Sequence, residues 1–178
     1  MRVLVLGIGN LLLQDEGIGV HIVTELQRRF QLPPGVELLD GGTAGMELVE
    51  AMLDKDQVIV VDAIRSDEKP GTVIQLEGDA VPAFLQQHLT PHQLGLADVL
   101  ATLAIAGHTP QRLILLGIVP RSMELSVTLS DELQQQFAGL VRRVTAKLIE
   151  FGIALTPKED VNSDQSLGPL TTEPSDEP

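Results

Sequence analysis

Apolar residues along the chain follow two spacings that alternate with one another. Short, almost continuous runs of Val, Ile and Leu predict buried strands. Between these runs, apolar residues recur every three or four positions, which is typical of helices with one buried face. We expect strands at residues 2–6, 36–39, 57–61, 72–76 and 112–119, and an edge strand at 124–129. We expect helices at residues 18–30, 46–52, 82–87, 94–105 and 131–152, with 94–105 largely buried.

Polar residues mark the ends of several of these segments. Asp15 and Glu16 precede the apolar stripe of residues 18–30, where a helix dipole favours negative charge, and two prolines at 33 and 34 follow it. Ser130 is a good N-cap for the last helix. Strands that alternate with helices predict an α/β fold: a three-layer sandwich with a twisted, mostly parallel sheet between helices.

Composition limits the class of protein further. The 178 residues are 43% hydrophobic, with four Phe and no Trp, Tyr or Cys, so the core is aliphatic and thiolate chemistry is excluded. We expect one domain at residues 1–155 and an acidic, disordered tail at 156–178, which lacks apolar periodicity. The net charge of −13 argues against a nucleic-acid partner. We expect no membrane span, no signal peptide and a cytoplasmic location.

Three polar residues at segment boundaries form a candidate metal site. Glu16, Asp62 and His92 supply two carboxylates and an imidazole, a plausible incomplete ligand set for a divalent ion. Asp62 is the strongest member, because a carboxylate inside the apolar run 58–64 must be paired, hydrogen-bonded or metal-bound. Glu16 and His92 also have structural alternatives, as a helix-dipole acid and a helix-start residue. Asp40, which ends the strand at 36–39, is a further candidate whose alternative is to cap the turn at Gly41 and Gly42.

Other side chains and motifs point to structural roles. We expect His21 on an exposed helix face and His88 and His108 in polar loops. Gly7-Ile8-Gly9 lacks the third glycine and the correctly spaced acid of a dinucleotide fingerprint, so these glycines serve a tight strand-to-helix turn and no cofactor-binding residue is assigned. No nucleophile elbow, HExxH motif or phosphate-binding loop is present. The residues alone therefore predict a metal-binding α/β domain.

The chain resembles the hydrogenase maturation endopeptidases over residues 1–157. The similarity is carried, in order, by Gly7-Ile8-Gly9-Asn10 with Asp15-Glu16-Gly17-Ile18-Gly19-Val20, by Leu39-Asp40-Gly41-Gly42-Thr43-Ala44-Gly45, by Val61-Asp62-Ala63, and by Thr90-Pro91-His92-Gln93-Leu94-Gly95-Leu96. Within the family, the chain looks closest to the branch that acts on membrane-associated, uptake-type hydrogenases.

The resemblance implies what this chain would do and which residues would do it. A member removes a short C-terminal peptide from the precursor of a nickel–iron hydrogenase large subunit after nickel insertion. Glu16, Asp62 and His92 would contact the nickel, Asp40 would take part through its glycine-rich loop, and Asp40, Glu16 and Asp62 are the candidate catalytic residues. We expect nickel to arrive with the substrate, since three ligands leave positions open, and we expect a monomer.

Two other functions stay open at this point. The same triad could serve a non-catalytic, nickel-sensing chaperone of hydrogenase assembly. A hydrolase of nucleosides or other small molecules could use the same kind of sheet, but the sequence shows no phosphate or base pocket for one.

Overall fold

The protein is described from a computed structural model, which covers residues 1–87 and 91–158, without the side chains of residues 91 and 92. Five strands form the main sheet, in the order β3-β1-β4-β6-β5. Their bounds are β1 (Val3–Ile8), β3 (Val36–Gly42), β4 (Gln57–Ala63), β5 (Val73–Glu77) and β6 (Arg112–Ile118). The first four of these in the sheet order are parallel, and only the edge strand β5 runs antiparallel to its neighbour.

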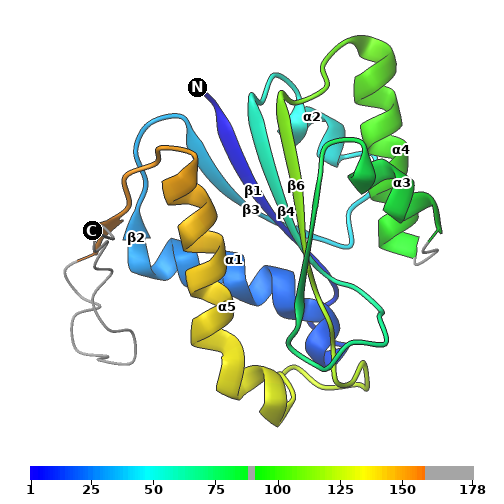
Figure 1. The fold of residues 1–178 in the computed structure, drawn as a ribbon, viewed down its shortest axis with the longest axis vertical. Coiled ribbons are helices and arrows are strands. Elements are labelled where there is room, and N and C mark those ends of the chain that lie inside the picture. The colour runs from blue at the N-terminus through cyan, green and yellow to red at the C-terminus, as the bar shows by residue number, and fades with distance from the viewer. Residues whose placement is uncertain (88–90, 159–178) are drawn as a thin grey trace, which may run out of the picture.

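Helices cover both faces of the sheet, which confirms the predicted three-layer α/β sandwich. The helices are η1 (Gln14–Gly17), α1 (Ile18–Arg29), α2 (Leu48–Met52), α3 (Ala80–Gln87), α4 (Pro91–Ala106) and α5 (Asp131–Glu150). Figure 1 shows α1 and α5 on one side of the strands and α2, α3 and α4 on the other. Two aliphatic clusters fill the two spaces, because alternate residues of each buried strand point to opposite faces.

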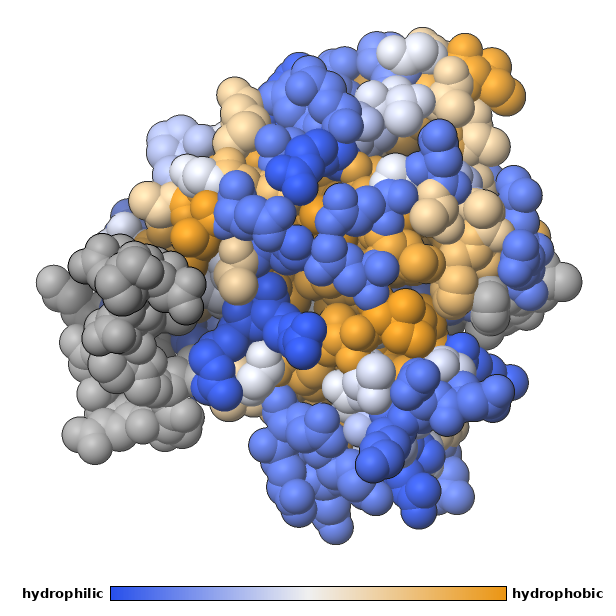
Figure 2. Space-filling model, in the orientation of Figure 1, coloured by the Kyte–Doolittle hydropathy of each residue, from blue (hydrophilic) through white to orange (hydrophobic). Residues whose placement is uncertain are grey.

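The four parallel strands run in the same direction, so their carboxyl ends lie along one edge of the sheet. In Figure 1, β1 descends from the N-terminus, so the carboxyl ends of the parallel strands and the start of α1 lie in the lower half of the view. Figure 2, in the same orientation, shows hydrophilic residues over most of this face, with hydrophobic surface between them near the middle and at the upper right. No helix within residues 1–87 and 91–158 is long and apolar enough to cross a bilayer.

Two expectations about individual segments are wrong. Residues 124–129 form no strand: a single isolated bridge joins Leu13 to Ser126, and the Ser126 hydroxyl bonds the Thr128 amide at 3.2 Å. This local side-chain bond bends the chain and competes with a ladder. Helix α4 is not largely buried, because only one face packs on the sheet and Ile105 is 90% exposed.

Both ends of the last helix behave as the sequence indicates, and the chain continues beyond it. The Ser130 hydroxyl accepts a bond from the Leu133 amide, which confirms the N-cap. Gly152 ends the helix with a left-handed φ of 79°. Beyond it, the two-residue strand β7 (Thr156–Pro157), which the sequence analysis assigned to the tail, pairs with β2 (Phe30–Gln31). Residues 159–178 of the predicted tail lie outside the described residues.

Candidate functional site at the carboxyl edge of the sheet

Asp40 and Asp62 end the two strands that flank β1. Gly7 of β1 is in register with Asp40 of β3 on one side and with Val61 of β4 on the other. Since neighbouring strands lie about 4.8 Å apart, the backbones at Asp40 and Val61 are separated by roughly 10 Å across β1. The two carboxylates therefore border one edge of the sheet, the edge at which ligands bind in parallel α/β folds.

Glycines bring α1 unusually close to this edge. A Cβ atom added to Gly19 would lie 2.1 Å from the Val61 carbonyl oxygen and 2.5 Å from that of Ile8. At Gly9, which has a left-handed φ of 134°, an added Cβ would lie 1.8 Å from the Glu16 carbonyl oxygen. These contacts confirm that the early glycines serve a close strand-to-helix approach. They also explain why the η1 turn, which carries Glu16, packs against β4.

Asp62 is fully buried, as its apolar surroundings in the sequence predict. Its Oδ2 atom accepts a long hydrogen bond of 3.4 Å from the Nε2 amide of Gln93, which also reaches the Ala63 carbonyl oxygen at 3.5 Å. Gln93 is itself only 2% exposed, and its Oε1 atom has no hydrogen-bond partner among the described residues. The first turn of α4 is thus joined to the end of β4 through a buried carboxylate and a buried amide.

Asp40 is exposed, in contrast to Asp62. Its Oδ1 atom accepts a 2.8 Å bond from the backbone amide of Gly42, which has a left-handed φ of 48°. This is the turn-capping role that the sequence offered as the structural alternative. The bond to Gly42 occupies one carboxylate oxygen, and the Asp40 side chain still faces solvent. Capping of the turn is therefore compatible with a catalytic role for Asp40.

Asp15 has a role that the sequence analysis missed. Its side chain is fully buried and accepts four hydrogen bonds: from the amides of Arg121, Ser122 and Ser130 and from the Ser130 hydroxyl, at 2.7 to 3.1 Å. The carboxylate therefore fastens η1 to the segment that leads into α5. No signal in the sequence identifies this network, because all its donors lie more than 100 positions away from Asp15.

Glu16 is partly buried in η1, and His92 lies in the first turn of α4. The side chain of His92 is outside the part of the chain that the structure describes. The described side chains by themselves contain no cluster of three His, Cys, Asp or Glu residues suited to a metal ion. Convergence of Glu16, Asp62 and His92 on one point therefore remains a prediction.

The remaining histidines differ in their surroundings. His21 is not on an exposed face as expected: it is half-buried, and its Nε2 atom is buried without a hydrogen-bond partner among the described residues. Burial lowers the pKa of His21 below its usual value. His108 lies at the surface, where its Nδ1 atom is 3.0 Å from a carboxylate oxygen of Asp54. His88 lies outside the described residues.

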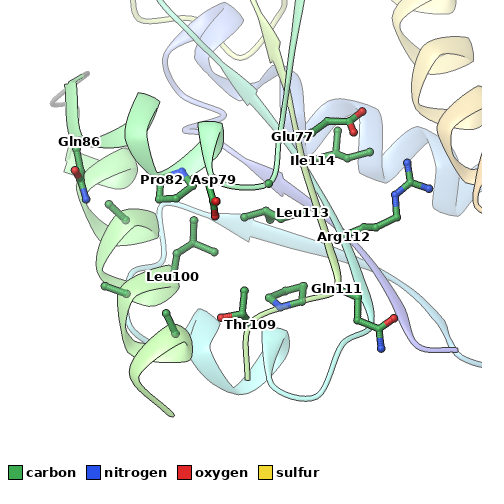
Figure 3. Close-up of a pocket in the computed structure, with 15 residues that line it drawn as sticks. Glu77, Asp79, Pro82, Gln86, Leu100, Thr109, Gln111, Arg112, Leu113 and Ile114 are labelled. Carbon is green, nitrogen blue, oxygen red and sulfur yellow. The ribbon is translucent and has the colours of Figure 1, made fainter. Parts of the chain in front are cut away.

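A cleft of about 580 Å³ lies at the opposite edge of the sheet, between α3, α4 and the start of β6. Figure 3 shows Asp79 and Leu100 lying between the helices and the strand. Arg112, at the rim, is held by Glu150 at 3.4 Å. The candidate carboxylates are all at the other end of the strands, so this cleft is separate from the candidate site.

Comparison with known proteins identifies close relatives. The sequence profile described as hydrogenase maturation protease (HycI) matches residues 20–147. The hydrogenase 2 maturation protease of Escherichia coli K12 is 45% identical over 163 residues, 91% of this chain and 99% of that protein. The hydrogenase expression/formation protein HupD of Thiocapsa roseopersicina is 37% identical over 165 residues, 92% of this chain and 75% of that protein.

Solved structures agree with the sequence comparison. The structure of the hydrogenase maturating endopeptidase HybD from E. coli superposes with a TM-score of 0.86 at 45% identity and covers 90% of this chain and 99% of that one. The [NiFe] hydrogenase maturation protease HybD from Thermococcus kodakarensis has a TM-score of 0.68 at 28% identity, covering 83% of this chain and 99% of that one.

Proposed function

The chain belongs to the hydrogenase maturation protease family, and we propose that it removes the C-terminal peptide from the precursor of a nickel–iron hydrogenase large subunit. The single observation that carries the assignment of the site is Asp62. Asp62 is a fully buried carboxylate at the carboxyl end of a central parallel strand, which is the edge where ligands bind in parallel α/β folds. In the proposal, a divalent ion presented by the substrate would bind this carboxylate during recognition.

In this proposal nickel is part of the substrate. Asp62, Glu16 and His92 provide two carboxylate oxygens and an imidazole nitrogen, which are acceptable nickel ligands. Three protein ligands would leave coordination positions for groups of the precursor, so these residues would recognise the ion as part of the substrate. A precursor without nickel lacks this contact and is rejected, which makes cleavage depend on prior metal insertion.

Peptide hydrolysis also requires a proton acceptor for the attacking water and a proton donor for the leaving nitrogen. We assign Asp40 to this exchange, because it is exposed at the same edge of the sheet as the buried Asp62 and is held by the Gly42 amide. Water adds to the scissile carbonyl carbon, the C–N bond breaks, and the proton taken from water passes to the departing amine. Together with Glu16 and Asp62, which would hold the ion, Asp40 completes the set of proposed catalytic residues.

The test is to mix the purified protein with nickel-loaded precursor and to measure the mass of the precursor over time. We expect loss of a C-terminal peptide with nickel-loaded precursor and an unchanged mass with nickel-free precursor. The matched variants are Asp62→Asn and Asp40→Asn, with Asp79→Asn as control, an exposed acid at the opposite edge. The first two should lose processing with the fold intact, and the control should process normally.

A second readout examines the metal without catalysis. Because the site is proposed to have an incomplete ligand set, protein purified without added metal should carry far less than one equivalent of nickel.

The alternative function, a nickel-sensing chaperone, predicts a stable complex with nickel-loaded precursor and no loss of mass. A stable complex together with an unchanged precursor mass would support the chaperone in place of the protease.

A further inference from the structure

Exposed apolar side chains gather at the carboxyl edge of the sheet. Ten large hydrophobic residues are exposed among those that the structure describes, and six of them lie on the loops and the helix start at this edge. We call these six the apolar rim: Leu11, Leu12, Met46, Leu94, Leu125 and Val127. Leu125 and Val127 are 83% and 65% exposed, which is unusual for neighbouring aliphatic residues with no binding role.

Backbone hydrogen bonds join neighbouring loops that carry the apolar rim. The Ser126 amide bonds the Leu12 carbonyl oxygen at 3.0 Å, which places the loop of Leu125 and Val127 beside that of Leu11 and Leu12. The Gly9 amide bonds the Gly42 carbonyl oxygen at 2.8 Å, which joins the loops that follow β1 and β3.

The start of α4 also lies close to the loop after β3. An added Cβ at Gly95 would lie 3.2 Å from the Cα of Gly45, so the backbone segments that carry Leu94 and Met46 approach each other. The buried pair of Asp62 and Gln93 lies within the same edge.

The charges on the same loops have one predominant sign. Glu16, Asp40, Glu47 and Glu124 place accessible or partly accessible carboxylates between the apolar residues. Two arginines also lie at this edge: Arg121 is paired with Glu132 at 3.2 Å, and Arg65 is exposed in the loop after β4. A surface of this kind complements a protein surface that is apolar at its centre and carries Lys or Arg at its margin.

We propose that the apolar rim is the docking surface for the body of the protein substrate, through an apolar patch of that substrate edged by basic residues. The inference rests on the proposed function and extends it, because it separates recognition of the folded substrate from contact with the metal and the scissile bond. Docking around the site holds the substrate while its C-terminal segment reaches Asp40 and Asp62.

The test compares Leu125→Ser with Ile105→Ser in the full chain. Both side chains are almost fully exposed, at 83% and 90%, but Ile105 lies at the far end of α4, near the opposite edge. Initial rates of cleavage of nickel-loaded precursor give KM and kcat for each variant. We expect Leu125→Ser to raise KM about fivefold or more and Leu12→Ser/Leu125→Ser to raise it further, as for residues central to an interface. Ile105→Ser should match the unmodified protein.

A second comparison examines the charges. Glu124→Gln should raise KM and reduce its dependence on salt, whereas Glu77→Gln, an exposed acid at the opposite edge, should change neither. Thermal melts check that each variant keeps its fold.

The outcomes separate this inference from the function on which it rests. An unmodified protein that leaves nickel-loaded precursor intact overturns the proposed function. Cleavage with the same KM in Leu125→Ser as in the unmodified protein overturns the rim alone. A dimer of the unmodified protein that dissociates in Leu125→Ser, seen by sedimentation, would assign the rim to a second copy of this chain and would also overturn the inference.

Discussion

Replacing Asp15 with Asn should destabilise the protein severely, although the two side chains have nearly the same shape. All four partners of the Asp15 carboxylate are donors, and the group is fully buried. An asparagine must direct its NH2 group at one of them. If the asparagine oxygen takes the place of Asp15 Oδ2, the NH2 group takes the place of Oδ1 and faces the Ser130 amide. In the unmodified protein, that amide donates a 2.8 Å hydrogen bond to Oδ1.

The expected cost follows from the burial of these donors. One unsatisfied buried donor costs about 1–3 kcal/mol, and the bonds that lose their charge assistance weaken as well, so the total is about 2–5 kcal/mol. For a chain of this size each kcal/mol lowers Tm by about 2–4 °C, which gives a decrease of roughly 4–20 °C. Processing should fall too, because Asp15 fastens the turn that carries Glu16.

The assay is a thermal melt of Asp15→Asn beside Asp131→Asn. Asp131 undergoes the same chemical change one residue beyond Ser130, but its side chain is exposed in the first turn of α5. Its loss should cost only the helix-dipole interaction, about 0.3–1 kcal/mol. Equal melting temperatures for the two variants would show that the Asp15 network contributes nothing beyond a surface acid and would refute the reasoning.

Three further predictions concern packing, pH and the end of the chain. Gly19→Ala should lower Tm by several degrees, because the new Cβ meets the Val61 carbonyl oxygen, and an unchanged melt would show that α1 can move away. Glu25→Gln should cost about 0.5–1 kcal/mol at pH 7 in urea titrations. The hydrogen bond from Arg28 holds the pKa of Glu25 below its usual value, so this contribution is present above pH 4.5 and is lost as pH falls through the lowered pKa. If the unfolding free energies of Glu25→Gln and the unmodified protein still differed at pH values below the lowered pKa, the ion pair of Glu25 with Arg28 would not be the cause. Deletion of residues 159–178 should leave the melt and processing unchanged, and loss of either would give that segment a role.

Strand positions could be predicted closely because burial on both faces leaves a strong signal. The apolar runs that end at Val61 and Val119 locate β4 and β6 within about two residues, as expected for central parallel strands. The direction of β5 could not be predicted, since a pattern of apolar residues records burial and not the identity of the neighbouring strand. The alternation at residues 124–129 was misleading for the same reason: Leu125 and Val127 alternate with polar residues but cover no sheet.

The candidate site was only partly predictable. Asp62 was recognisable because its carboxylate interrupts an apolar run, a local signal that survives without knowledge of the fold. Gln93 carries no such signal, since a glutamine near a helix start is ordinary in sequence, and only the packing of α4 beside β4 buries its amide next to Asp62. Residues whose roles depend on distant partners, such as Asp15 and Gln93, therefore require the structure.

The adjacent acids Asp15 and Glu16 illustrate how the structure separates two roles that the sequence left joined. Both were expected to stabilise the start of a helix through its dipole. The helix α1 begins at Ile18 with Gly17 as its N-cap and has no acid in its first turn, whereas both acids lie in the first turn of the preceding 3-10 helix η1. Asp15 instead points into the protein and satisfies buried donors, while Glu16 is only partly buried on the turn that packs against β4. Because Asp15, and not Glu16, accepts the four buried hydrogen bonds that fasten η1, we expect replacement of Glu16 to affect processing more than stability.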